Sequence, residues 1–509
     1  MSRKQNTEFE FAPPPASSMI EALRGVGYST ETAIADLIDN SISAGANNVW
    51  INFWWAGRDS YVSTLDDGEG MEEKELSSAM RPGSQSPLDE RSAHDLGRFG
   101  LGLKTASFSQ CRRLTVASRR DGRLATRRWD LDHVARVDDW QLLTGPARGS
   151  EKLIKPLEAI EQGTLVLWEC MDRVVGKSAT SDQRSHDSFL RLVDKVEQHL
   201  AMVFHRFLEG APPELRIFIN GDDEDHRVRA WDPFMRHHRA TLSTPAERIP
   251  TPRGDVEIQG FVLPHKDRLV RNEFQTGAGP GGWTAQQGFY VYRNRRMLVS
   301  GDWLGLGHSR TWTREEPYKL ARLRLDIPNT ADADWKIDIK KSVAHPPSYL
   351  EYRLRDLADC VRRDARQVFA HRGTYGQRSP IPDLQRAWKA IERRDSVLYR
   401  VDRDHPVVKR VLDQAGPLSE AVEAMLRVLE ETVPVQRIWL DTVEKGQVQK
   451  GAFADAPSAD LEAILRVLYR HLVKTVGLTP DKAREQLLTT EPFQNFPELV
   501  EALPDHMDR

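Results

Sequence analysis

The sequence is poor in cysteine. Cys111, Cys170 and Cys360 are the three cysteines in 509 residues, and they stand far apart. This spacing argues against a disulfide framework and against a cysteine-ligated metal site. We therefore expect a protein of a reducing compartment.

Long apolar runs are also missing. No stretch is long enough to cross a bilayer, and the N-terminal segment MSRKQNTEFEFAPPPASS is polar, without the apolar centre of a signal peptide. We expect a cytoplasmic protein with no membrane partner.

There is no excess of positive charge either. The net charge is −3, so any contact with nucleic acid must come from a local patch. Two basic stretches are candidates. Residues 112–128 hold seven arginines, for which a solvated hairpin face is the favoured interpretation. For VYRNRRMLVS, residues 291–300, a solvated face and a nucleic-acid surface remain open alternatives.

The sequence does contain enough apolar residues, 39%, to bury large cores. Its length suggests about three domains. Prolines 13–15 break regular structure near the start, strand-like and helical stretches follow, and the composition becomes mainly helical after Gly373. We expect an α+β protein with an arm (1–18), two α/β domains (19–208 and 209–372) and a helical region (373–509).

An unusual helix is predicted to begin near Ser29 or Thr30. Its apolar residues keep helical spacing, yet Asp36, Asp39 and Asn40 interrupt them. Buried acidic groups are costly unless they are paired. Asp36 and Asn40 are four residues apart, so they share a face. The Asn40 amide oxygen can bind Mg²⁺, and Asp36 is placed to orient or deprotonate a water. Asp39 is expected to be a local structural partner.

Glycine-rich segments follow in a fixed order. They read DDGEGM at 66–71, GRFGLGLK at 97–104 and Gly-Thr at 163–164. A carboxylate at a strand end can accept from an exocyclic amine such as that of adenine. Glycines let the backbone approach a flat base or leave N–H groups free for phosphate oxygens, and a helix N-terminus attracts the same oxygens. A Gly-x-x-Gly-x-Gly pattern alone is often only a loop. All of these elements in this order are much harder to obtain by chance.

The glycine pattern differs from two common phosphate-binding motifs. The sequence has no Gly-x-x-x-x-Gly-Lys-Ser/Thr, and residues 97–102 read Gly-x-x-Gly-x-Gly instead of the Gly-x-Gly-x-x-Gly order of dinucleotide-binding folds. What is present resembles the GHKL ATPases, which include DNA gyrase, the MutL proteins, the large heat-shock chaperones, the sensor histidine kinases and the MORC proteins. The resemblance is carried by DLIDNSISAGA, DDGEGM, GRFGLGLKTAS and GTLVLWE, over about residues 18 to 170. It is closest to bacterial MORC-like proteins.

This resemblance implies ATP and Mg²⁺ as ligands, a GHKL (Bergerat) α/β sandwich for the first domain and a transducer-like second domain. Asn40 would bind Mg²⁺, and residues 72–99 would be the ATP lid. Asp36 would act on the water, and Lys341, with Lys340 as second choice, would reach the terminal phosphate from the loop DWKIDIKKS. The adenine contacts would be Asp66, Gly68, Gly70, Met71 and Thr164, and the phosphate contacts Gly97, Gly100, Leu101, Gly102, Leu103 and Lys104.

One position departs from the family pattern. The general base is usually a glutamate where this chain has Asp36. The side chain is shorter by roughly 1.5 Å, and misplacement on that scale can cost about a hundredfold in rate. Slow hydrolysis is expected.

The expected function is an ATP-dependent, dimerising clamp on double-stranded DNA, suited to DNA processing or defence against phage. No endonuclease metal motif or topoisomerase tyrosine domain is evident, so nuclease or helicase activity would come from partner proteins. A heat-shock-type chaperone is the main alternative. A sensor kinase is disfavoured, because the first histidine, His94, follows the first two boxes.

Overall fold

The computed structural model describes residues 14–25, 27–83, 102–331, 334–338, 341, 343–370, 385–393, 396–434 and 459–505. The expectations for Gly97, Gly100, Leu101 and Lys340 lie outside these residues. The chain forms two compact units, Met1–Gly376 and Gln377–Arg509. Mixed sheets and helices confirm the α+β class.

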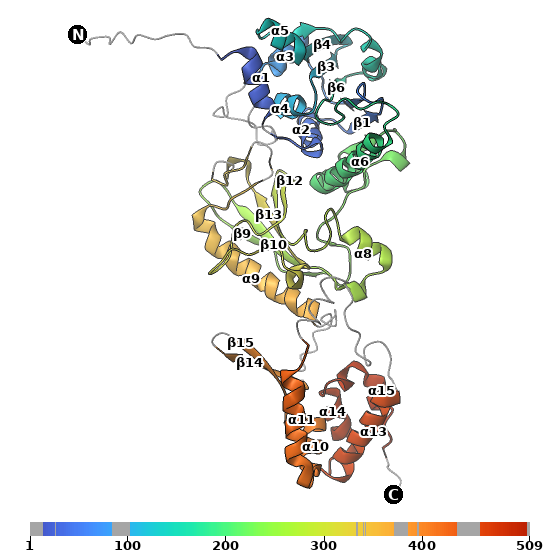
Figure 1. The fold of residues 1–509 in the computed structure, drawn as a ribbon, viewed down its shortest axis with the longest axis vertical. Coiled ribbons are helices and arrows are strands. Elements are labelled where there is room, and N and C mark those ends of the chain that lie inside the picture. The colour runs from blue at the N-terminus through green and yellow to red at the C-terminus, as the bar shows by residue number, and fades with distance from the viewer. Residues whose placement is uncertain are drawn as a thin grey trace, which may run out of the picture. The chain divides into compact units, whose positions relative to one another are not determined.

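The first lobe of unit Met1–Gly376 is a seven-stranded sheet with helices packed on it (Figure 1). The strand order is β5-β4-β3-β6-β2-β1-β7, and all neighbours are antiparallel except β1 and β7. The strands are β1 (Asn48–Trp54), β2 (Tyr61–Asp66), β3 (Arg113–Arg120), β4 (Arg123–Asp130), β5 (Leu143–Thr144), β6 (Gly163–Glu169) and β7 (Arg216–Ile219). The helices are α1 (Ala16–Arg24), α2 (Thr30–Ser43), α3 (Glu73–Met80), α4 (Gly102–Gln110), α5 (Leu131–Val137), α6 (Gln183–Val203) and α7 (His205–Leu208).

Helix α2 begins where the sequence predicted. The Ser29 side chain accepts from the Thr32 N–H, as an N-cap residue does. The apolar residues Ala33, Ile34 and Ile38 are completely buried in the core of the lobe. Because α2 also contacts α4 and α6, this helix has little free surface, and its polar residues must be satisfied by neighbouring elements.

The hairpin of β3 and β4 also agrees with its sequence, since Asp121-Gly122 within the basic stretch 112–128 predicts a two-residue turn. Asp121 and Gly122 have φ of 50° and 74°, and Arg120 pairs with Arg123 across the turn. Two consecutive positive φ angles are typical of the tight turns whose twist matches that of the strands.

The lid region differs from the expected loop. Residues 72–96, within the expected lid, are polar and contain Pro82, Gly83 and Pro87, a pattern that predicts a loop, but residues 73–80 form α3. A capping box joins Glu72 and Glu75 at its start, and Leu76 and Met80, one turn apart, are fully buried. This buried pair was too short a signal to stand out. Helix α1, similarly, begins at Ala16, inside the expected arm.

The second lobe of the same unit is a six-stranded sheet in the order β12-β11-β13-β10-β8, with β9 also pairing with β10. Strands β11 and β13 are parallel. The long helix α9 (Ser348–Ala370) runs along this sheet and packs on β10 and β13 (Figure 1). The strands are β8 (Leu242–Ser243), β9 (Glu247–Ile249), β10 (Val256–Val262), β11 (Gly288–Arg293), β12 (Arg296–Asp302) and β13 (Ala321–Ile327), and α8 is Arg271–Gly277.

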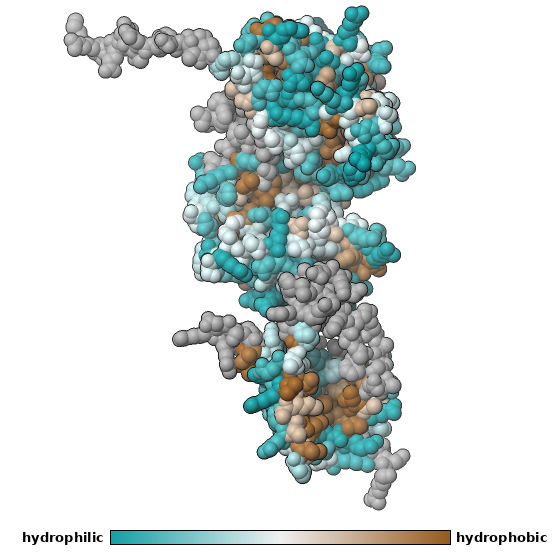
Figure 2. All heavy atoms as spheres, in the orientation of Figure 1, coloured by the Kyte–Doolittle hydropathy of each residue, from teal (hydrophilic) through white to brown (hydrophobic). Residues whose placement is uncertain are grey.

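Unit Gln377–Arg509 is mainly helical, as expected, but it also contains a hairpin that was not predicted. Its strands are β14 (Trp388–Arg393) and β15 (Ser396–Val401). The helices are α10 (Pro406–Gln414), α11 (Ser419–Glu431), α13 (Ala459–Lys474), α14 (Pro480–Leu488) and α15 (Pro497–Glu501). Figure 2 shows hydrophobic residues on the surface of this unit. Val411 of α10 and Met425 and Val428 of α11 are exposed. In the described part of the chain, no helix has the length and apolar character of a membrane span.

Candidate functional site

Asp66, at the end of β2, is a buried carboxylate surrounded by neutral donors. Its Oδ2 accepts from the Ser41 hydroxyl at 2.8 Å, and its Oδ1 accepts from the N–H groups of Gly68 (3.1 Å) and Thr164 (3.2 Å). Burial raises the pKa of Asp66 above its usual value, against these hydrogen bonds. A carboxylate offers about four acceptor positions, so one further donor fits here.

Ser118 of β3 connects the other residues predicted at this end of the sheet. Its hydroxyl accepts from the Met71 N–H at 2.8 Å, lies 2.9 Å from the Thr164 hydroxyl and donates to the Gly163 carbonyl at 3.1 Å. Sequence reasoning missed Ser118, because a serine in the middle of a strand carries no recognisable signal. Met71 and Thr164, both predicted, are half-buried beside it.

The two glycines of DDGEGM are required by the protein's own backbone. A Cβ on Gly68 would lie 3.0 Å from the Ala44 carbonyl oxygen and 2.8 Å from the Ala44 Cβ. Gly70 has φ of +66°, and a Cβ there would lie 2.1 Å from the Arg119 carbonyl oxygen. Only glycine fits at Gly70. Contact with a base remains a prediction for both residues.

A second group of charges lies where α2 meets the second lobe. The Lys341 ammonium, in the segment between β13 and α9, donates to Asp36 Oδ1 at 3.1 Å and to Asp39 Oδ2 at 2.6 Å. Arg296 of β12 donates to Asp39 Oδ1 at 3.2 Å. All four side chains are at most 9% exposed. Asp36 and Lys341, which are 305 residues apart, are thus brought into contact.

The expectation for Asp39 was wrong in one respect. Its charged partners are not local: they are 257 and 302 residues away in the chain. Helical spacing placed Asp39 off the line of Asp36 and Asn40, but spacing says nothing about which other element covers that side of the helix. Burial alone would raise the pKa of Asp39, yet Arg296 and Lys341 hold it below its usual value. Arg296 was not foreseen in this role.

Tyr28, which precedes α2, was also missed. Its hydroxyl donates to Asp36 Oδ2 at 2.9 Å. Burial and the charge of Asp36 raise the pKa of Tyr28 far above its usual value. Asp36 therefore has a partner on each carboxylate oxygen.

The predicted metal ligand, Asn40, is exposed on α2, one turn after Asp36. Gly102 is the first residue of α4, and a Cβ there would lie 3.4 Å from Asp36 Oδ2. The N-terminus of α4 therefore lies next to Asp36. Leu103 is half-buried and packs against the core of the lobe. An exposed amide oxygen, a carboxylate and a helix N-terminus form a donor set suited to a Mg²⁺–phosphate group.

Lys104 is directed to the lid region. Its ammonium donates to the carbonyl of Ala79 at 2.8 Å, near the end of α3. Burial lowers the pKa of Lys104 to about 8. Contact of this ammonium with phosphate remains a prediction, and it would require Lys104 to leave Ala79.

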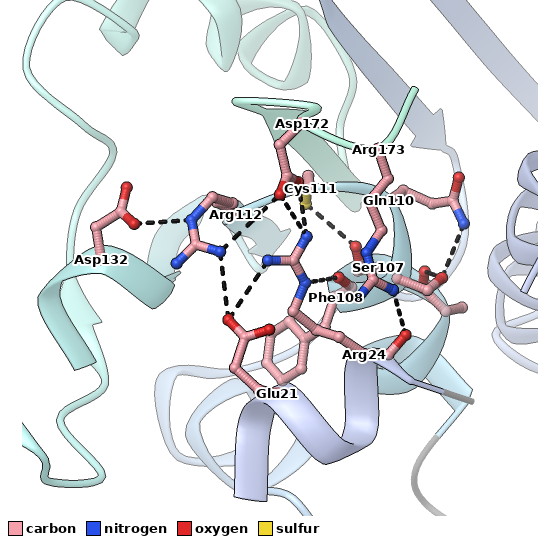
Figure 3. Close-up of polar contacts among 12 residues, drawn as sticks. Glu21, Arg24, Ser107, Phe108, Gln110, Cys111, Arg112, Asp132, Asp172 and Arg173 are labelled. Carbon is pink, nitrogen blue, oxygen red and sulfur yellow. Dashed lines mark hydrogen bonds and ion pairs between the residues drawn. The ribbon is translucent and has the colours of Figure 1, made fainter. Parts of the chain in front are cut away.

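The basic stretches are largely paired within the protein. Arg112 contacts Glu21 and Asp132, and Arg120 and Arg127 pair with Glu75 and Glu73 of the α3 region. Figure 3 shows that Arg24 of α1 belongs to the same network as Arg112: it binds both oxygens of Asp172, at 2.6 and 2.8 Å. In the second stretch, Arg295 binds Glu214 and Arg296 binds Asp39. These pairs support the solvated or structural interpretation.

A group of possible metal ligands outside this site is also paired. Atoms of His205, Glu209 and Asp232 lie within 4.8 Å of one another. The two ring nitrogens of His205 already contact Glu209 (2.6 Å) and the Tyr292 hydroxyl (2.8 Å). Arg236 binds both Glu209 and Asp232. The chemistry is that of an ion-pair network.

Comparison with known proteins agrees with this geometry. Residues 28–164 match the family model of histidine kinase-, DNA gyrase B- and HSP90-like ATPases. Over 91 residues the chain is 32% identical to ATPase morc-1 of Caenorhabditis elegans. These residues are 18% of this chain and 10% of the relative. The chain thus spans about a tenth of the length of that relative. Residues 28–164 are thus similar to GHKL-type ATPase domains, and part of the chain is similar to a MORC ATPase.

Proposed function

We propose that this chain binds ATP with Mg²⁺ at the site around Asp66 and α2, and that it hydrolyses ATP slowly. The observation that carries the proposal is the buried Asp66 carboxylate with its three neutral donors, inside the segment that matches the ATPase model. A buried carboxylate without a compensating cation is costly, and the amine of adenine supplies a further donor.

The remaining roles follow from the positions of the side chains. Thr164 contacts Asp66 and Met71 contacts Ser118, where the base would rest, with Gly68 and Gly70 in the turn after Asp66. Asn40 would hold Mg²⁺, which neutralises phosphate charge when it is bound. The N-terminus of α4 and Lys104 would contact phosphate oxygens, together with the preceding loop. These phosphate contacts are Gly97, Gly100, Leu101, Gly102, Leu103 and Lys104.

Hydrolysis is assigned to Asp36. A water oxygen bonds to the terminal phosphorus, the bond from that phosphorus to the ADP oxygen breaks, and the water proton goes to the Asp36 carboxylate. The shorter side chain supports slow turnover. We expect Asp36→Ala to retain nucleotide binding and to lose hydrolysis, because general-base catalysis contributes about 10² to 10⁴ in rate. Full turnover in Asp36→Ala would remove this role.

Lys341 would bind the terminal phosphate. Its present partners, Asp36 and Asp39, support this, since the ammonium already lies against the base-bearing helix. A move from Asp36 to the phosphate would expose the carboxylate to water and change the contact between the two lobes. ATP binding would in this way shift the population of lobe arrangements.

We further propose that ATP binding closes two copies into a clamp on double-stranded DNA, with nuclease or helicase partners, in DNA processing or defence against phage. The MORC-like match supports this. Because the basic stretches are paired internally, the DNA contact would be made by a surface completed in the dimer.

The decisive experiment is sedimentation with and without a nonhydrolysable ATP analogue, with DNA retention measured at high salt. The wild type should become dimeric and retain DNA only with the analogue. Asn40→Ala should do neither, whereas Asn272→Ala, an exposed helical asparagine of α8, should behave as wild type. If the analogue changes neither mass nor DNA retention, the clamp is rejected.

A heat-shock-type chaperone is the second candidate. The exposed apolar residues Met425 and Val428 of α11, together with Leu418 just before this helix, favour it, since large exposed apolar patches bind other proteins. A chaperone should suppress the aggregation of an unfolded client in an ATP-dependent manner. A clamp should leave that aggregation unchanged.

A further inference from the structure

The hydroxyl of Tyr28 joins the two helices that form the phosphate side of the site. It donates to Asp36 Oδ2 on α2 at 2.9 Å, and it is also hydrogen-bonded to the Thr105 side chain on α4. Tyr28 is buried, with 7% of its surface exposed. Its ring is therefore held by its neighbours, and its hydroxyl group is fixed next to Asp36.

The backbone of Tyr28 is held as well. Its carbonyl accepts from Gln110 Nε2 at the end of α4, at 3.1 Å. The side-chain oxygen of the same glutamine accepts from the Thr30 hydroxyl at the start of α2, at 2.7 Å. Tyr28 is thus fixed at both ends by α2 and α4, so its hydroxyl does not need to be ordered when the nucleotide binds.

The two oxygens of Asp36 have partners of different kinds. Oδ2 accepts from Tyr28, which lies in the same lobe, while Oδ1 accepts from Lys341, which comes from the second lobe. Because the pKa of Tyr28 is raised far above its usual value, the phenol remains a donor at any working pH. The partner on Oδ2 is thus a neutral group of the same lobe, whereas the partner on Oδ1 is a cation from the second lobe, for which a phosphate would compete.

We propose that Tyr28 is a positioning residue for Asp36: it holds Oδ2, so that Oδ1, once Lys341 moves to the terminal phosphate, faces the water and accepts its proton. This inference rests on the proposed ATP hydrolysis. A short carboxylate has little reach, so its orientation decides whether it contacts the water. One hydrogen bond to one oxygen removes the rotation that would misplace the other.

Tyr28→Phe is the direct test, because it removes one oxygen atom and keeps the ring. We expect kcat for ATP hydrolysis to fall about tenfold or more, the loss typical of a hydrogen bond to a charged group. The dissociation constant for a fluorescent ATP analogue and the KM should stay within about twofold, since Tyr28 is assigned no contact with the nucleotide. This split between kcat and KM distinguishes positioning from a structural role.

A matched control exists in the second lobe. Tyr290 is fully buried, and its hydroxyl donates to Gln286. The Tyr290→Phe variant therefore also loses a buried hydroxyl group, one that bonds to Gln286 instead of Asp36. This variant should hydrolyse ATP as the wild type does. Thr105→Val, which removes the second partner of the Tyr28 hydroxyl, should lower kcat in the same direction by a smaller factor.

The outcomes separate the two levels of the proposal. If the wild type neither binds nor hydrolyses ATP, the proposed function fails and the inference fails with it. If the wild type hydrolyses ATP and Tyr28→Phe is as active, the inference alone is overturned. If Tyr28→Phe loses binding and hydrolysis together, or unfolds while Tyr290→Phe does not, Tyr28 is structural and the inference is also overturned.

Discussion

Buried carboxylates occupy two places in the first lobe, and they are stabilised in opposite ways. Asp66 is held by neutral donors from its own lobe, and burial raises its pKa. Asp36 and Asp39 are held largely by cations that the second lobe supplies, and these cations lower the pKa of Asp39. The Asp66 site is complete without the second lobe. The cations that pair with Asp36 and Asp39 are present only while the two lobes are packed together.

The difference suggests a division of labour. A carboxylate that retains an acceptor position and has neutral partners is prepared for an incoming donor, as expected for recognition of a base. Carboxylates paired with cations from another lobe are prepared for exchange, because a phosphate can compete for the same cation. Recognition and mechanical response would then depend on different residues, and substitutions can separate them.

The largest expected effect is on stability, at Asp39. Asp39→Ala leaves Arg296 without its buried carboxylate and Lys341 with one of two, and removal of one member of a buried ion pair costs about 3–5 kcal/mol. Unfolding in urea measures this loss in the free energy of unfolding. Asp59→Ala removes an acid that is 78% exposed and should cost about 0.5 kcal/mol or less. Equal losses in the two variants would contradict the assignment.

The next effect is on nucleotide binding, at Asp66. Asp66→Asn keeps the shape, and its amide can still accept from Gly68 and Thr164 and donate to Ser41. Its new N–H group would face the adenine amine, and two donors cannot form a hydrogen bond with each other. We expect about 10- to 100-fold weaker binding of ATP, measured by calorimetry, with an unchanged or slightly higher free energy of unfolding. A large loss of stability with intact binding would reverse the comparison.

Acid should distinguish the two sites through their pKa shifts. A lowered pKa at Asp39 stabilises the fold above the ordinary carboxyl range, and this contribution is lost as pH falls through the folded-state pKa. A raised pKa at Asp66 costs stability at neutral pH, and that cost disappears on acidification. Stability against pH should therefore show the deficit of Asp39→Asn shrinking in acid and the advantage of Asp66→Asn shrinking in acid. A deficit of Asp39→Asn that grows in acid would contradict the ion pairing.

The smallest expected effect is the uptake of a fraction of a proton by Lys104 when ATP binds. Its pKa of about 8 means that much of it is uncharged above that pH. Phosphate close to the ammonium would raise the pKa, so ATP binding should take up a fraction of a proton near pH 8.5. Calorimetry in buffers of different ionisation enthalpy measures this uptake, and Lys104→Met should abolish it. Equal uptake by the variant would place the proton elsewhere.

Much of the fold could be predicted, because its signals are local. The spacing of Ala33, Ile34 and Ile38 indicated α2, and Asp121-Gly122 indicated the hairpin. Helix α3 was missed because two apolar residues, Leu76 and Met80, are too few to define a period. The β14–β15 hairpin was missed because the region was interpreted from its helical stretches alone.

The candidate site also contains features that follow from short stretches of sequence and features that depend on tertiary packing. Asp36 and Asn40 on one helical face, and Asp66 at a strand end, are properties of short stretches of chain, so the sequence by itself determined them. The partners of Asp36 and Asp39 were decided by the tertiary structure. Tyr28, Arg296 and Lys341 are brought together by the packing of two lobes, and the cost of a buried charge is settled only by what lies against it.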